Sequence, residues 1–226
     1  MAADNLEPRT SNLEPAADAR LLIAASEADA NLFYATRFLA PDAFVFLWHG
    51  EEKILLMSDL ELDRARSQAA VDKVFPIRAY EERAKRPGVE RPTLVDALHE
   101  LLKERSVRSV LVPGSFPIQH GDALRERGIH VQVKREPFWE ERLVKSPVEV
   151  KAIADALRRT EAALDAAIAA IRRADVREGV LWWRGAVLTS EAVRRLIAGY
   201  LLESGLMAAH TIVAGGGDAC DPHNEG

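Results

Sequence analysis

The sequence predicts an α/β protein in which a mixed β-sheet flanked by helices is followed by a second, mainly helical region. Two observations indicate this fold. Between residues 20 and 135, short apolar runs alternate with amphipathic stretches of helical periodicity, which is the pattern of an α/β domain. Beyond residue 146, apolar residues recur at intervals of three, four and seven over many turns, which favours a long amphipathic helix.

The first 19 residues are predicted to form a mobile tail. They contain the tetrapeptide NLEP twice, at 5–8 and 12–15, and few large apolar side chains. Such a segment cannot bury enough apolar surface to offset the entropy lost on folding. The remaining chain is rich enough in apolar residues, 48% of the whole sequence, to build a sizeable core.

Several short β-branched and aromatic runs in the first region are candidate strands. The hairpin is indicated by two apolar runs flanking a Gly-Glu-Glu turn within Asp42–Ser58. Pro76 predicts that its strand lies at an edge of the sheet or carries a bulge, because proline cannot donate to a central ladder. The other expected strands are RLLIAAS at 20–26, KVFPIRAY at 73–80, RSVLVPG at 108–114 and IHVQVKR at 129–135.

Helical stretches separate these strands. Residues 92–105 place Leu94, Leu98 and Leu101 on one face, and a helix over 117–127 is closed by Gly128. The hairpin makes the expected sheet mixed rather than all parallel. The first domain is therefore expected to span residues 20–135, with a linker at 136–146.

The second region, 147–226, begins with a strong helix-start signal. Ser146 and Glu149 have capping-box spacing, and Pro147 sits at the first helical position. A helix of up to about seven turns is expected to follow, then a second helix at 190–204 that Thr189 or Ser190 caps, and then a strand over HTIVAGG. This strand has no evident sheet partner, which suggests an unfinished domain. Trp182 and Trp183 are expected to lie in a loop before the second helix.

Composition narrows the classes of partner and location. The net charge of −5 argues against nucleic acid as the main partner. No stretch approaches the ~20 apolar residues of a membrane span, and the N-terminus lacks the apolar region of a secretory signal. The single cysteine, Cys220, rules out an internal disulfide. We expect a cytoplasmic protein with no nucleic-acid or membrane partner.

No self-contained active site is evident from spacing alone. No H-E-x-x-H motif, zinc-type Cys/His cluster or nucleophile elbow occurs. The glycines at 215–217 have two open interpretations, a loose turn or a backbone that passes close to a ligand. The first four histidines are interpreted as surface or packing residues. The six are His49, His99, His120, His130, His210 and His223.

Three segments resemble, in order, the metallopeptidases that include Xaa-Pro aminopeptidase, Xaa-Pro dipeptidase (prolidase) and creatinase, the M24 or pita-bread family. ERLVKSPVEVKAIADALRRTEAAL (141–164) resembles the junction into the first catalytic-domain helix, and LTSEAVRRLIAGYLLESG resembles the second helix. HTIVAGGGDACDPHNEG resembles the strand and loop that carry the first catalytic histidine. The region 20–135 is similar to the creatinase-type N-terminal domain, and 147–226 to the start of an incomplete α+β pita-bread domain.

The resemblance implies a dinuclear metallopeptidase that hydrolyses peptides with proline in the second position. Two divalent ions (manganese, cobalt or zinc) would be held by two Asp, one His and two Glu, none of which is expected in this sequence. Only His223 carries over, as a residue that binds substrate or the tetrahedral intermediate; alone, it could instead be a solvated residue. The resemblance also implies a peptide substrate and a homo-oligomer. We therefore expect an inactive N-terminal part, or alternatively a non-catalytic peptide-binding or oligomerisation module.

Overall fold

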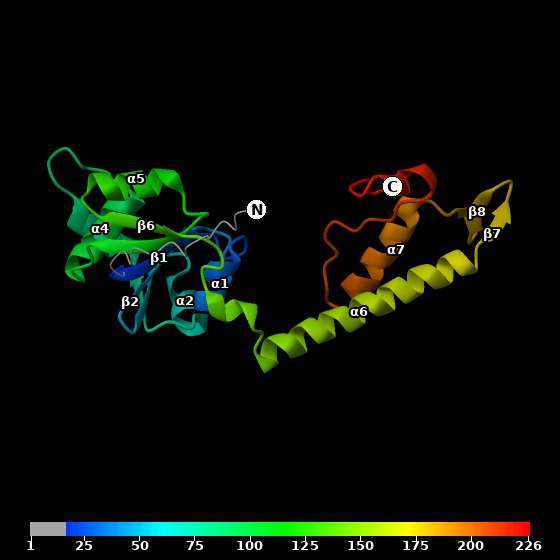
Figure 1. Cartoon of the computed structure of the whole chain (residues 1–226), viewed down its shortest axis with the longest axis horizontal. Coiled ribbons are helices and arrows are strands. Elements are labelled where there is room, and N and C mark those ends of the chain that lie inside the picture. The colour runs from blue at the N-terminus through cyan, green and yellow to red at the C-terminus, as the bar shows by residue number, and fades with distance from the viewer. Residues whose placement is uncertain (1–16) are drawn as a thin grey trace, which may run out of the picture. The chain divides into compact units, whose positions relative to one another are not determined.

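The computed structural model describes residues 17–226, which form two compact units (Figure 1). The first unit ends at Leu143 and the second runs from Val144 to Gly226. The tail predicted over residues 1–19 lies mostly outside the described residues, although Ala19 already begins the first strand. No helix within residues 17–226 is long and apolar enough to cross a membrane.

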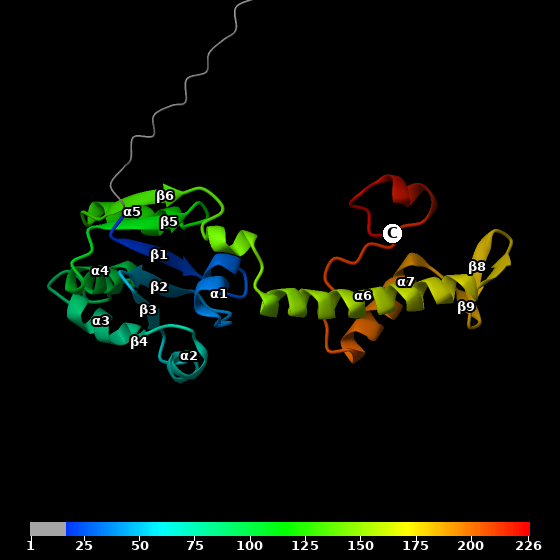
Figure 2. The ribbon, with the colours of Figure 1, turned by 60° about the horizontal axis from the view of Figure 1, so that its bottom comes forward.

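The first unit is built on one six-stranded mixed sheet (Figure 2). The order β4-β3-β2-β1-β5-β6 places the antiparallel hairpin β2–β3 and strand β1 in the middle, with parallel pairs at both ends. The mixed sheet predicted from the sequence is confirmed. Its strands are β1 (Ala19–Ala24), β2 (Phe44–His49), β3 (Glu52–Met57), β4 (Lys73–Pro76), β5 (Ser109–Pro113) and β6 (His130–Lys134).

Both faces of this sheet are covered, because its central strands are apolar on both sides. Leu21 and Ile23 of β1 belong to a core shared with α3, α4 and α5, whereas Leu22 points into a second core formed with α1 and α2. Phe138 and Trp139, within the segment predicted as a linker, close this second core. The helices are α1 (Ala30–Thr36), α2 (Leu62–Gln68), α3 (Ile77–Ala84), α4 (Leu94–Glu104), α5 (Ile118–Glu126) and the 3₁₀ turn η1 (Glu140–Leu143).

Strand β4 lies at the edge of the sheet, as Pro76 predicts. The strand expected over 73–80 nevertheless ends at Pro76, and Ile77–Ala84 forms helix α3 instead. Proline, with its fixed φ, serves as the N-cap residue of this helix. Helices α1 and α2 were not predicted, since each has only seven residues and too few turns to show periodicity.

Helix α4 begins with a fully formed capping box. The Thr93 hydroxyl accepts from the Asp96 backbone N–H, while the Asp96 carboxylate accepts from the Thr93 backbone N–H at 2.8 Å. Asp96 also pairs with Arg127, which follows α5, at 2.7 Å. This carboxylate therefore fixes the start of α4 and joins α4 to the end of α5.

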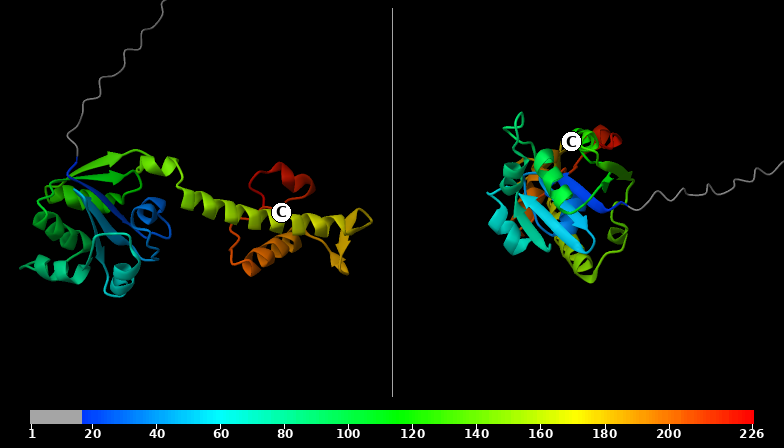
Figure 3. Two further views of the ribbon diagram at one scale, coloured as in Figure 1. Left: turned by 90° about the horizontal axis from the view of Figure 1, so that it is seen from below. Right: turned by 90° about the vertical axis from the view of Figure 1, so that its left-hand side faces the viewer.

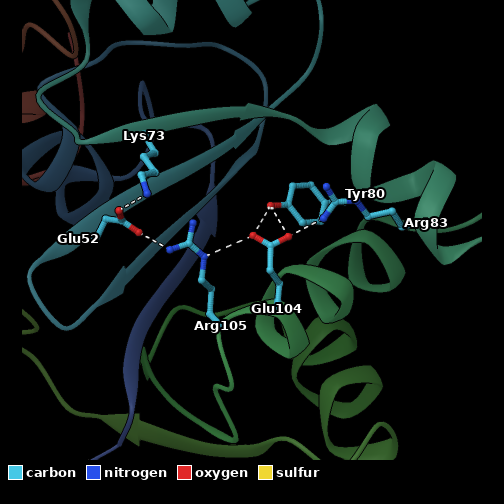
Figure 4. Close-up of polar contacts among 6 residues, drawn as sticks. All are labelled: Glu52, Lys73, Tyr80, Arg83, Glu104 and Arg105. Carbon is cyan, nitrogen blue, oxygen red and sulfur yellow. Dashed lines mark hydrogen bonds and ion pairs between the residues drawn. The ribbon is translucent and has the colours of Figure 1, made fainter.

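A network of charged side chains joins one edge of the sheet to helices α3 and α4. Glu52 of β3 accepts from Lys73 of β4 at 2.5 Å and also from Arg105, which in turn lies 3.6 Å from Glu104. Single surface ion pairs contribute little, but shared partners restrain several elements at once. The members, drawn in Figure 4, are Glu52, Lys73, Tyr80, Arg83, Glu104 and Arg105.

The second unit consists of a long helix, a small antiparallel sheet and a second helix (Figure 3). The capping box of Ser146 and Glu149 is formed as expected, and Thr189 caps the second helix through its hydroxyl. Helix α7 packs against α6. The elements are α6 (Pro147–Arg172), β7 (Asp175–Arg177), β8 (Val180–Trp183), β9 (Ala186–Val187), α7 (Ser190–Glu203) and the 3₁₀ turn η2 (Gly216–Cys220).

Two expectations for this unit are wrong. The residues HTIVAGG (210–216) do not form a strand, because the only sheet found here within the described residues is β7-β8-β9 and these residues do not pair with it. A strand needs a neighbour to satisfy its backbone N–H and C=O groups. Trp182 and Trp183, expected in a loop, instead lie in the central strand β8.

The second unit buries few large side chains. On α6 only Ala163, Ala167 and Ala170 are buried, and on α7 only Val193 and Leu201. We expect amide hydrogen exchange to be markedly slower in β1, β2 and β5 of the first unit than in α6, α7 and residues 206–226. Mass-spectrometric exchange on the intact chain measures this, and equal protection in the two units would contradict it.

Candidate functional site

His223, the residue singled out by the sequence, lies in an exposed turn that follows η2. Its backbone N–H donates to the Asp221 carboxylate at 3.0 Å. The backbone N–H of Asn224 donates to the Asp221 carbonyl at 3.1 Å. The side-chain amide of Asn224 donates to the Asp218 carboxylate at 3.3 Å. Within residues 17–226, no hydrogen bond or ion pair engages the His223 imidazole, so the turn presents this ring to solvent.

This turn is anchored to the rest of its unit by two contacts. Val213 donates its backbone N–H to the Glu225 carbonyl at 3.2 Å. Arg194 of α7 donates to the Glu225 carbonyl and, at 2.8 Å, to the Gly226 oxygen. The guanidinium therefore ties the loop that carries His223 to a helix whose position is set by packing against α6.

The glycines at 215–217 lie at the start of the 3₁₀ turn η2 (Gly216–Cys220). Gly216 has φ of +58°, a left-handed conformation that glycine adopts readily. A Cβ atom built on Gly215, Gly216 or Gly217 would meet no atom within 4 Å. Close approach of another part of the described chain therefore does not explain these glycines.

The described residues do not fit the metal pair that the family resemblance implies. No group of three or more His, Cys, Asp or Glu side chains within residues 17–226 could hold a metal ion. Near His223, Asp218 and Asp221 use carboxylate oxygens on the amides of their own loop. A cage for two cations needs several converging carboxylates, and this region provides none.

The other histidines do not form a site with His223. Burial lowers the pKa of both His99 and His120, and nearby Lys103 adds to the effect on His99. These two residues are partly buried on α4 and α5 of the first unit. Cys220 is exposed.

A separate group of side chains in the first unit was not predicted from the sequence. Arg20, Trp48 and Lys53 lie side by side on three neighbouring strands, because Trp48 pairs with Arg20 across β1–β2 and with Lys53 across β2–β3. Strand alternation could have indicated their common face. The register that aligns the three strands, however, cannot be predicted from one sequence.

Comparison with known proteins gives a clear result for the fold alone. No family model and no curated protein matches the chain. Among solved structures, prolidase from Pyrococcus furiosus is 16% identical with a TM-score of 0.64, covering 92% of this chain and 56% of its own. Xaa-Pro dipeptidase from Bacillus anthracis is 15% identical with a TM-score of 0.63, covering 83% of this chain and 45% of its own.

X-Pro aminopeptidase from Thermotoga maritima MSB8 is also similar, at 13% identity and a TM-score of 0.59, covering 83% of this chain and 47% of its own. The chain therefore has the fold of the Xaa-Pro peptidases, as its resemblance predicted. It spans about half of the length of these solved chains.

Proposed function

We propose that this chain is the N-terminal part of a dinuclear-metal Xaa-Pro peptidase. Residues 20–135 would be its creatinase-type domain, 136–146 the junction, and 147–226 the start of its catalytic domain. The observation that carries this proposal is the fold match to prolidase, which extends over 92% of the chain and so includes residues of both units. The proposed substrate is a peptide with proline in the second position, and the proposed assembly is a homo-oligomer.

In this proposal, His223 binds the substrate or the tetrahedral intermediate. Its support is the arrangement of its loop: an exposed imidazole on a turn stabilised by Asp221 and anchored by Arg194. A hydrogen-bond donor next to developing negative charge stabilises that charge. The metal ions and their ligands would lie outside residues 17–226, which give two cations no cage.

The 226-residue chain on its own is expected to show no turnover of Xaa-Pro dipeptides when Mn²⁺ is added, because the hydrolytic centre needs ligands that residues 17–226 do not bring together. Release of free proline, measured by chromatography, is the assay, and a full-length Xaa-Pro dipeptidase is the positive control. Turnover by this chain, or two tightly bound metal ions per molecule by elemental analysis, would refute the proposal.

The positive half of the test uses the gene. The proposal predicts that the open reading frame containing the codons for residues 1–226 also encodes two Asp, one His and two Glu that bind the metal ions. The enzyme encoded by that whole reading frame is expected to cleave Xaa-Pro peptides. In that enzyme, His223→Ala should lower kcat by about 100-fold or more, whereas His130→Ala, an exposed histidine of the first unit, should leave it unchanged. Equal kcat values for the two variants would remove the role assigned to His223.

A further inference from the structure

The first unit contains a cavity of about 320 Å³ that does not involve His223. This volume is at the lower end of the range of small-molecule sites. Helix α1, strands β2 and β3, and the segment after β6 form its walls. The side chains that give it chemical character are Tyr34, Arg37, Trp48, Lys53, Trp139 and Glu141.

Three aromatic rings of this cavity already carry cations on their faces. The ammonium of Lys53 lies 5.0 Å from the centroid of Trp48, and the Arg20 guanidinium lies 5.0 Å from the centroids of both Trp48 and Trp139. Arg37 lies 4.7 Å from the centroid of Tyr34. These are ordinary cation–π distances, so the aromatic surface and the positive charge occupy the same place.

The strand register produces this arrangement. Arg20, Trp48 and Lys53 are cross-strand neighbours, two residues beyond Leu22, Phe46 and Leu55 on the same face of the sheet. The apolar core therefore ends in a row of one indole between two cations. Trp139 covers this row, with its ring centroid 5.5 Å from that of Trp48.

The two cations that flank Trp48 have no carboxylate partners among residues 17–226: neither Lys53 nor Arg20 takes part in an ion pair there. Elsewhere in the first unit, cations such as Lys73, Arg105 and Arg127 are paired with carboxylates. The indole N–H of Trp48 is also buried with no hydrogen-bond partner in the described residues. An unused donor beside two uncompensated cations creates a local demand for an anion.

We propose that this cavity binds a small organic anion with a flat apolar body, of the class of aromatic carboxylates. The rings of Trp48, Trp139 and Tyr34 would pack against the body, and the Lys53 ammonium would pair with the carboxylate. A cationic ligand is disfavoured, because the positive charges of Arg20, Arg37 and Lys53, which lie beside these rings, would repel it. Glu141, exposed at the wall, is the only acid among the residues lining this cavity. This inference is independent of the proposed peptidase function.

The test uses the 226-residue chain and 4-fluorobenzoate as the probe, observed by ¹⁹F NMR and by calorimetry. We expect saturable one-to-one binding with Kd on the order of 1 mM or tighter, which is realistic for a ligand of this size. The neutral 4-fluorobenzyl alcohol and the cation choline are expected to bind at least about tenfold more weakly. Binding should also weaken as salt increases.

Lys53→Met removes the charge and keeps the aliphatic stem, and should weaken 4-fluorobenzoate binding about tenfold, the loss typical of one charge-assisted contact. Lys85→Met is the matched control, because Lys85 is an exposed lysine paired with Glu82 outside this cavity. The Kd of this variant for 4-fluorobenzoate should equal that of the unchanged chain. Circular dichroism verifies that both variants fold. Absence of saturable binding at 10 mM probe (about ten times the expected Kd), equal binding of the alcohol, or equal Kd values for the two variants would overturn the proposal.

Discussion

Trp139→Ala is expected to reduce the free energy of unfolding of the first unit by about 3–5 kcal/mol, the range for truncating a buried tryptophan. Trp139 is only 2% exposed. Its ring packs edge-on against Phe138, with centroids 4.7 Å apart, and its indole N–H donates to the Asn31 carbonyl at 3.0 Å. Truncation opens a cavity in the core beneath α1 and leaves that buried carbonyl without its donor.

Urea denaturation, followed by circular dichroism and by hydrogen exchange in β1 and β2, measures this effect. A loss of this size corresponds to a shift of about 2 M in the urea midpoint, for a unit of this size. Trp183→Ala in the second unit is the matched control and should leave the exchange of β1 and β2 unchanged. Trp139→Phe should recover most of the loss, because it restores the ring contacts but not the hydrogen bond. A loss below about 1 kcal/mol for Trp139→Ala would show that residues 138–139 do not belong to this core.

Asp96→Ala is the second substitution with a large expected effect, a loss of about 2–4 kcal/mol. The change removes the carboxylate half of the capping box of α4, and it leaves Arg127, a partly buried cation, without its carboxylate. Asp63→Ala, at an exposed position of helix α2, removes a carboxylate whose contact with Arg66 is long, at 3.5 Å, and should cost less than about 0.5 kcal/mol. Chemical denaturation of the two variants at pH 7 provides the comparison, and equal losses would contradict it.

The same carboxylate gives the unit a pH dependence. Burial alone would raise the pKa of Asp96, but hydrogen bonds from Thr93 and Arg127 outweigh it and hold the pKa at about 2, below the ordinary value of 3.8. Because the pKa is lower in the folded state, the stabilisation is complete well above pH 4 and is lost as the pH falls toward 2. The contribution is about 2 kcal/mol. The stability difference between wild type and Asp96→Asn should shrink by this amount between pH 6 and pH 2; a constant difference would show that Asp96 does not titrate this way.

The elements that were predicted correctly carry their signal locally. The capping box of Ser146 and the leucine face of α4 lie within a few residues of sequence, so composition and spacing suffice. The predictions that failed concern elements whose formation depends on partners distant in the sequence. The expected strand at 210–216 has suitable residues but no neighbour, and Trp182 belongs to a sheet of short strands in which no run of apolar residues is long enough to show a period.

The candidate sites divide in the same way. His223 was found because its loop resembles a known motif. Arg194, which contacts the end of this loop at Gly226, lies in the same unit. The cavity beside Trp48 joins residues about a hundred positions apart, Tyr34 and Glu141 among them. Its cations and rings meet only through the register of β1, β2 and β3. Each residue by itself is an ordinary surface or core position, so no local pattern marks the set.

The short edge strand β4 has a consequence for how the first unit behaves in concentrated solution. An open sheet margin invites backbone pairing with another molecule and, eventually, fibril growth. Here the margin is four residues long, begins with a lysine and ends with a proline that has no N–H to offer. A second molecule that pairs with this edge would find too few free backbone N–H groups to form a stable intermolecular sheet. This edge of the unit is therefore protected against aggregation by strand addition.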